Sequence, residues 1–422
     1  MKSLTLRIAL VMAASFAVMS PSAALARHSL GGVIRDVGGR ATRADRARIA
    51  NLGALPYIGG AVLHQNRTHL IFWQPAGSGL TFEPGYRALI ETFMKNVAAA
   101  SHSTSNVYGL TGQYRDRRGP AAYASVYGGA VTATDPLPPN ECVEPSSTGP
   151  GWSVCLTDQQ LQREIERVVR RNALPTRSTD LYFLVTPNGL GDCEYSGSKS
   201  CALGGDVNGY CGYHSVTNDG LVLYAVIPYN AVPGHCQSDN PRPNGSSADP
   251  VISTISHEQS EMITDPFGDA WVDPNTGNED GDLCLINFGP AIGGSGAGAW
   301  NEVISGGHYF LQEEWSNHSG GCQPRAQPDT VSFRASLHST SPLSVWFVPH
   351  ASDPQGSIAS YRWFFGNGHT AVGRRAQHRY WHPGRYHVTL RSTDSWGNWA
   401  YYAATLTISR VGGRSVLATN AG

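Results

Sequence analysis

Eight cysteines place the strongest constraint on how this 422-residue chain folds, and all of them lie between positions 142 and 322. Their number is even, and no two of them form a C-x-x-C unit of the kind that binds zinc. Cysteines in this arrangement are typical of structural disulfides, which persist in oxidising compartments. The sequence therefore predicts a disulfide-bonded central domain, with the pairing open at this point.

The first 26 residues predict export. Lys2 and Arg7 give a basic start, residues 8–19 form an apolar run too short to span a bilayer, and Ala24 and Ala26 supply a small-residue cleavage pattern. We therefore expect residues 1–26 to be a signal peptide and the mature protein to be secreted and extracellular, with the periplasm or cell wall as the other destinations. Residues 27–54 are rich in arginine and lack an apolar face, so we expect a basic, mobile arm that suits a pro-segment.

The charge balance narrows the class of partner. The formal net charge is −1, from 31 basic and 32 acidic residues, and no basic stripe suits nucleic acid or an anionic membrane. No segment after residue 26 is apolar enough to cross a bilayer. We expect an extracellular protein or a cell-wall component as the substrate or partner, no nucleic acid and no membrane span, and we leave the oligomeric state open.

Residues 55–325 form the main body and mix helices with strands. Apolar residues at helical spacing predict helices over 86–99, from 157 onward and from 249 onward. Short apolar runs at 181–186 and 221–227 predict core strands. Because these segments do not alternate as regular strand–helix–strand units, we predict an α+β domain.

The composition changes near residues 323–328, where prolines cluster after the last cysteine. Apolar and polar residues then alternate with a period of two at 361–365, 386–391 and 401–408, as half-buried strands do. The sequence predicts an all-β, immunoglobulin-like sandwich over residues 328–410 and a tail over residues 411–422.

This C-terminal segment resembles a PKD domain. Residues 351–368 read A-S-D-P-Q-G-S-I-A-S-Y-R-W-F-F-G-N-G, and the centre of the PKD signature is usually W-D-F-G-D-G. Phe364 and Asn367 stand where aspartates are usual, which argues against cation binding at this motif. The resemblance implies a binding or spacer module of the kind appended to exported hydrolases.

The helix beginning at Asp249 and Pro250 carries the residues best suited to chemistry. A spacing of four places His257 and Glu261 one turn apart on the face opposite the apolar stripe, with Glu258 beside them. The run H-E-x-x-E is like the zincin helix H-E-x-x-H with glutamate as the second ligand. We predict His257 and Glu261 as zinc ligands and Glu258 as the catalytic base. Solvated carboxylates on a helix surface are the alternative interpretation.

The loop after this helix brings carboxylates back toward it. Glu279 and Asp282 are the candidates for the third metal ligand, and we favour Glu279, because its longer side chain can reach back across the turn. Asp282 would then support the ligands or hold calcium. His214 is a candidate substrate-polarising group, and the alternative ligand from upstream. The same loop also suits calcium, because it offers hard oxygen donors among glycines: Asp273, Asn275, Glu279, Asp280 and Asp282. The sequence therefore leaves a catalytic zinc and a structural calcium as alternatives.

The body also resembles the EXORDIUM, or phosphate-induced protein 1, group of secreted proteins. Short blocks match in order between residues 59 and 322, among them L-I-F-W at 70–73, Y-C-G-Y-H at 210–214, H-E-Q-S-E at 257–261 and E-D-G-D-L-C at 279–284. The resemblance implies a secreted protein associated with cell walls and growth, with a zincin-like helix. It also suggests disulfides that close loops across the matched blocks, Cys211–Cys236 and Cys284–Cys322, in addition to the local pairs Cys142–Cys155 and Cys193–Cys201.

These observations lead to two expectations for function. The first is a secreted, zinc-dependent hydrolase of the peptidase type, with a zincin-like body followed by a PKD domain. The alternative is a non-catalytic cell-wall, matrix or adhesion protein in which calcium orders the acidic loop.

Overall fold

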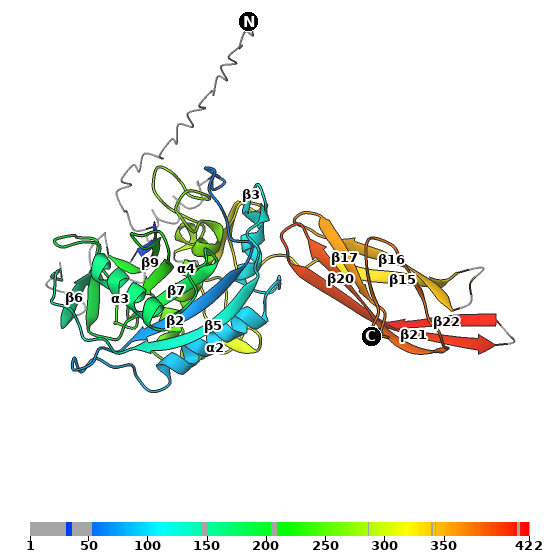
Figure 1. Cartoon of the computed structure of the whole chain (residues 1–422), viewed down its shortest axis with the longest axis horizontal. Helices are drawn as coiled ribbons and strands as arrows, with labels where there is room; N and C mark the ends of the chain where they lie inside the picture. Colours follow the sequence, from blue (N-terminus) through cyan, green and yellow to red (C-terminus); the bar gives the residue numbers. More distant parts are fainter. Residues whose placement is uncertain are drawn as a thin grey trace, which may run out of the picture.

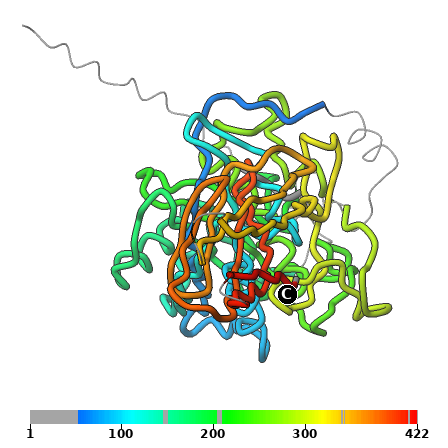
Figure 2. The backbone as a smooth tube through the Cα atoms, turned by 90° about the vertical axis from the view of Figure 1, so that its right-hand side faces the viewer, coloured from blue at the N-terminus to red at the C-terminus, as the bar shows by residue number. Residues whose placement is uncertain are grey.

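The computed structural model describes residues 31–35, 53–144, 151–203, 209–285, 287–338, 341, 343–411 and 414–421. The predicted signal peptide and residues 27–30 and 36–52 of the predicted arm lie outside these residues. Within them, the chain forms a mixed α/β body followed by an all-β domain at one end of it (Figures 1 and 2). No helix of the described part is long and apolar enough to span a bilayer.

The body is built on a six-stranded sheet with the order β1-β9-β10-β7-β2-β5. Its strands are β1 (Gly31–Arg35), β2 (Asn66–Trp73), β5 (Ser125–Ala133), β7 (Asp180–Val185), β9 (Tyr210–Val216) and β10 (Leu223–Ile227). The four strands from β10 to β5 run parallel, whereas β9 is antiparallel to β10 and β1 is antiparallel to β9. The predicted α+β class is thus corrected to mixed α/β, since irregular crossovers hide the parallel connections in the sequence.

Three helices cover the sheet: α2 (Tyr86–Ala99), α3 (Asp158–Arg171) and α4 (Ala248–Thr264). Alternate residues of β2 point to opposite faces, as the pleat requires. Leu70 and Phe72 pack into the core beneath α2 and α4, whereas Ile71 and Trp73 pack into the core beneath α3. The sheet is therefore buried on both faces, and α4 lies entirely in the interior.

Shorter elements complete the body. They are η1 (Val107–Gln113), β3 (Arg115–Asp116), β4 (Gly119–Pro120), β6 (Val154–Thr157), β8 (Leu190–Cys193), η2 (Asp282–Cys284), η3 (Gly296–Gly298), β11 (Glu302–Ile304), β12 (Gly307–Tyr309), β13 (Glu314–Ser316) and β14 (Gly321–Gln323).

The C-terminal domain is a sandwich of a three-stranded sheet, β15-β16-β19, and a five-stranded sheet, β18-β17-β20-β21-β22. Its core contains Trp363, Phe347 and Leu390. The strands are β15 (Thr330–Leu337), β16 (Ser344–Ser352), β17 (Ile358–Phe364), β18 (Thr370–Val372), β19 (Ala376–Arg379), β20 (Gly384–Asp394), β21 (Trp399–Val411) and β22 (Arg414–Ala421).

Two sequence-based boundaries need correction. The predicted tail contains β22, which pairs with β21 along its length. The predicted mobile arm contains β1, which pairs with β9. In both places a sheet edge offers unpaired backbone groups, and a segment without a strong apolar pattern can satisfy them.

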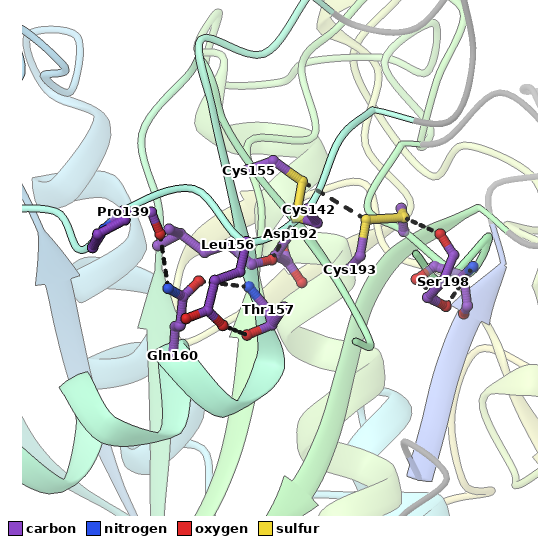
Figure 3. Close-up of a disulfide and its surroundings, with 12 residues drawn as sticks. Pro139, Cys142, Cys155, Leu156, Thr157, Gln160, Asp192, Cys193 and Ser198 are labelled. Carbon is purple, nitrogen blue, oxygen red and sulfur yellow. Dashed lines mark hydrogen bonds between the residues drawn. A yellow bond between two sulfur atoms is a disulfide. The ribbon is translucent and has the colours of Figure 1, made fainter. Parts of the chain in front are cut away.

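Four disulfides tie the body together, and they are the four predicted pairs. The Cα atoms of Cys142–Cys155, Cys193–Cys201, Cys211–Cys236 and Cys284–Cys322 are 5.1, 4.0, 5.4 and 5.7 Å apart. The first two lie side by side near the start of α3, with the Sγ atoms of Cys155 and Cys193 3.8 Å apart (Figure 3). The other two hold the chain next to the residues of the candidate site.

Candidate metal centre

Helix α4 places His257 and Glu261 on one face. The helix ends at Thr264 and is followed by Asp265, whose Oδ1 accepts hydrogen bonds from the backbone N–H groups of Asp269 and Ala270, both at 2.8 Å. Because α4 is buried all round, its polar side chains require partners inside the protein. Nε2 of His257 lies 2.9 Å from Oε1 of Glu261, one turn further along.

Two other segments bring their side chains to this face of α4. From β9, His214 places Nδ1 3.2 Å from Oε2 of Glu258 and 3.7 Å from Oε2 of Glu261. From the loop after α4, Asp282 places Oδ1 3.8 Å from His257 Nε2, and Glu279 places Oε1 3.7 Å from His214 Nε2. The geometry therefore forms two overlapping groups that share Glu261, one with His257 and Asp282 and one with His214 and Glu279.

These spacings suit a bound cation. Two ligands that are each about 2 Å from one zinc ion in tetrahedral geometry lie about 3.3 Å apart. Nε2 of His257 lies 2.9 Å from Glu261 and 3.8 Å from Asp282, which fits this spacing. His214 lies 3.7 Å from Glu261 through Nδ1 and 3.7 Å from Glu279 through Nε2, so it can offer an ion only one of these two nitrogens.

Four buried polar atoms in these groups, and a fifth on the neighbouring Glu258, lack a hydrogen-bond partner: Nε2 of His214, Nε2 of His257, Oε2 of Glu261, Oε2 of Glu279 and Oε1 of Glu258. Buried polar atoms are nearly always paired, and an exception points to a missing ion or water. These atoms converge from β9, α4 and the following loop. The residues present therefore fit a divalent cation.

Backbone contacts hold the loop against the helix. The N–H of Asp282 donates to Oε1 of Glu261 at 3.0 Å, and the N–H of Glu279 donates to Oδ2 of Asp282 at 3.1 Å. Gly281 packs so closely on His257 that a Cβ at this position would lie 2.6 Å from the imidazole Nδ1. The loop position thus requires glycine.

Burial sets the electrostatics of the centre. It lowers the pKa of His214 to about 3 and also lowers the pKa of His257, so both imidazoles are neutral, which is the form that binds metal. Burial, followed by repulsion from neighbouring carboxylates, raises the pKa values of Glu258, Glu261 and Glu279 well above normal. A cation at the centre would remove this penalty by favouring the ionised carboxylates.

The structure brings the predicted site residues together in a particular arrangement. Asp282, rather than the favoured Glu279, is grouped with His257 and Glu261, because the backbone of Asp282 is bonded to Glu261. Glu279 lies with His214 and Glu261. The predicted calcium loop is divided, because Asp273 and Asn275 form a local turn at the surface, with Asn275 N–H donating to Asp273 Oδ1 at 2.9 Å. Asp280 instead points to α4 and accepts hydrogen bonds from Ser260 and Thr264 at 3.2 and 3.0 Å.

Sequence reasoning missed two buried residues next to the centre. Gln312 Nε2 lies 3.0 Å from His257 Nδ1 and 2.7 Å from the carbonyl oxygen of Gly281, so this side chain links the helix to the loop. Both carboxyl oxygens of Glu314 are buried without a hydrogen-bond partner, and burial raises its pKa well above normal. The only signal in the sequence was the F-L-Q block at 310–312, which supported the family resemblance without indicating a role.

Known proteins match the two parts of the chain differently. Residues 325–411 match the family model of the PKD domain. The chain is 40% identical over 68 residues to a microbial collagenase of Vibrio alginolyticus, a match that covers 16% of this chain and 8% of that protein. The crystal structure of the PKD1 domain of Vibrio anguillarum Epp is 29% identical, with 20% of this chain and 95% of that chain covered and a TM-score of 0.18. The C-terminal domain is thus PKD-like by its family model.

The longest of these matches is to Protein EXORDIUM-like 3 of Arabidopsis thaliana. It is 26% identical over 308 residues, covering 65% of this chain and 83% of that protein. This match supports the resemblance to EXORDIUM-like proteins, and it extends well beyond the PKD-like domain.

Proposed function

We propose that the protein is an extracellular, metal-dependent hydrolase that cleaves peptide substrates. The observation that carries the proposal is the set of five unpartnered, buried polar atoms on His214, His257, Glu258, Glu261 and Glu279. The donor set favours zinc over calcium, because calcium takes oxygen ligands and imidazole suits zinc.

The side chains divide into two roles. The ion would be held by His257, Glu261 and Asp282. Further ligands would come from His214 and Glu279, which lie on the other side of Glu261. A bound zinc ion supplies a Lewis acid that polarises a carbonyl and acidifies water. Glu258 is left as the base, because its Oε2 faces His214 at 3.2 Å while its Oε1 has no partner. A carboxylate at this position can accept a proton from water and pass it to a leaving amine.

The test is metal content and peptide cleavage by the full mature chain. We expect about one equivalent of zinc in the protein as purified and cleavage of a quenched fluorescent peptide library that a chelator abolishes. Glu261→Gln, which keeps the side-chain shape, should lose zinc, whereas Glu258→Gln should keep zinc and lose cleavage. His350→Ala, at an exposed position of the C-terminal domain, is the control. Full zinc binding by Glu261→Gln, or full cleavage by Glu258→Gln, would contradict the proposal.

The alternative is a non-catalytic binding protein with structural calcium, and one observation favours a cation outside α4. In the C-terminal domain, carboxyl oxygens of Asp329, Asp353 and Asp394 lie within 4.8 Å of one another. Both oxygens of Asp329 and Oδ2 of Asp353 have no hydrogen-bond partner. Under this alternative, calcium raises the melting temperature of the parent protein but not that of Asp353→Asn. Zinc changes the melting temperature of neither the parent protein nor the variant.

A further inference from the structure

Strand β1 lies at the edge of the sheet next to the candidate metal centre. It pairs antiparallel with β9, with Gly31 opposite His214 and Ile34 opposite Gly212. It also contacts α4 and η2, the elements that carry His257 and Asp282. Residues 31–35 therefore lie across the candidate site. Without them, β9 would be the edge strand of the sheet and its backbone would be open at this position.

The site is closed in the intact chain. His214, His257 and Glu261 are 1%, 0% and 0% exposed, although hydrolysis requires that a substrate reach these groups. β9 is bound on its other side by β10. Its edge from Gly212 to His214 faces β1, and a chain that replaced β1 would pair with the same edge.

No disulfide fixes the segment that carries β1, so its backbone pairing with β9 is reversible. Residues 27–54 contain no cysteine, so no disulfide fixes them, and Arg40, Arg43, Arg46 and Arg48 follow β1 before residue 55. A segment joined to its binding site by a short flexible linker has an effective concentration of about 1 mM. An occupant with a dissociation constant of about 0.1 mM would then fill the edge in about nine-tenths of the molecules, and it would leave after cleavage at micromolar protein.

We propose that residues 31–35 are an intramolecular occupant of the substrate site, and that an extended peptide takes their place on β9 once the segment is displaced or cut. The backbone pairing identifies the class of ligand. A strand edge recognises the repeating N–H and C=O groups of an extended polypeptide, largely independently of its sequence. A peptide bound this way runs antiparallel to β9 and passes beside His214. The role of the bound peptide as a substrate rests on the proposed function, whereas its docking does not.

The experiment uses the full mature chain with residues 42–48 replaced by the recognition sequence of a specific endoprotease. Hydrogen exchange at the β9 amides is followed before and after cleavage, and after addition of a synthetic peptide of residues 27–40 or its scrambled version. We expect β9 exchange to rise about tenfold on cleavage, as the occupancy estimate predicts, and to fall again when an excess of the synthetic peptide is added. Val33→Pro with Ile34→Pro should release β1 without cleavage, because proline cannot donate to the ladder. Ala41→Pro, outside β1, is the matched control.

The outcomes separate this proposal from the proposed function. Unchanged β9 exchange after cleavage and in the proline variant would overturn the occupancy of the edge. Faster exchange without protection by any added peptide would overturn peptide docking. Peptide protection of β9 in a zinc-loaded protein that cleaves no peptide would leave the docking site in place and reject the hydrolase.

Discussion

The ring of Trp399 stacks on that of His102 across the boundary between the two domains, with centroids 3.9 Å apart and planes at 11°. The N–H of Trp399 donates to the carbonyl oxygen of His102 at 2.7 Å, and Nδ1 of His102 lies 2.8 Å from the carbonyl oxygen of Gly397. The turn between β20 and β21 is therefore bonded to the body directly after α2.

A second set of contacts extends this interface along η1. Trp396 packs with Leu110 and Ala326, and Asn398 Nδ2 donates to the carbonyl oxygen of Gly109 at 3.1 Å. A Cβ on Gly112 would lie 2.1 Å from the carbonyl oxygen of Trp396. The C-terminal domain is thus docked on the body at a fixed orientation, although its core is separate.

Gly112→Val should undock the C-terminal domain without unfolding either core. The added side chain cannot fit against Trp396, and the contacts around His102 and Asn398 are lost with it. We expect a larger radius of gyration by small-angle X-ray scattering and a lower melting temperature for the C-terminal domain. Gly298→Val is the control, because a Cβ there meets nothing within 4 Å. An unchanged radius of gyration would contradict a docked interface.

The sequence predicted local features well and relations between distant segments less well. The apolar residues at helical spacing over 86–99 predict both ends of α2 correctly, because amphipathic spacing depends only on the sequence of the segment itself. The spacing of His257 and Glu261 likewise follows from helix geometry. By contrast, the parallel sheet depends on irregular crossovers, and β1 depends on an open edge at β9, which is about 180 residues away along the chain. Gln312 was missed for the same reason, since a neutral side chain shows its role only through what it contacts.

Gln312 should control metal affinity through His257. A histidine that binds metal through Nε2 must carry a proton on Nδ1, which needs an acceptor. Gln312 faces this atom with its Nε2 donor, so metal binding requires the amide to turn its unpartnered Oε1 toward Nδ1. Removing an outer partner of this kind typically lowers metal affinity by about 10-fold to 100-fold. We expect this loss for Gln312→Ala in competition with a zinc indicator. Gln312→Glu supplies an acceptor for His257 Nδ1, so its zinc affinity should be close to that of the parent protein. Equal losses of affinity in the two variants would indicate a purely structural role for Gln312.

Glu302 should make the folded protein less stable as the pH rises. Burial raises the pKa of this carboxyl to about 9 from a normal value of 4.5, so between these values the folded state retains a proton that the unfolded chain releases. The free energy of unfolding then falls with rising pH across this window, by at most about 1.4 kcal/mol per pH unit. Glu302→Gln cannot ionise, so we expect its stability relative to the parent protein to increase steadily from pH 5 to pH 9 in urea titrations. Glu141→Gln, at an exposed position, is the control. A constant difference across this range would show that Glu302 is not held in its protonated form.

The disulfide Cys284–Cys322 should support the metal centre as well as the fold, because Cys284 lies in η2, which also contains Asp282. In the chain-entropy model, its loss costs about 4 kcal/mol for a separation of 38 residues, against about 3 kcal/mol for the 13 residues between Cys142 and Cys155. The two double-alanine variants should therefore lose similar stability. Zinc affinity should fall only in the variant that combines Cys284→Ala with Cys322→Ala. Of the two bridges, only Cys284–Cys322 anchors the loop that places Asp282 beside His257 and Glu279 beside His214. Melting temperatures and zinc competition titrations below the melting point test both parts. Equal zinc affinity in the two variants would mean that the contacts of Asp282 and Gln312 hold the loop without the bridge.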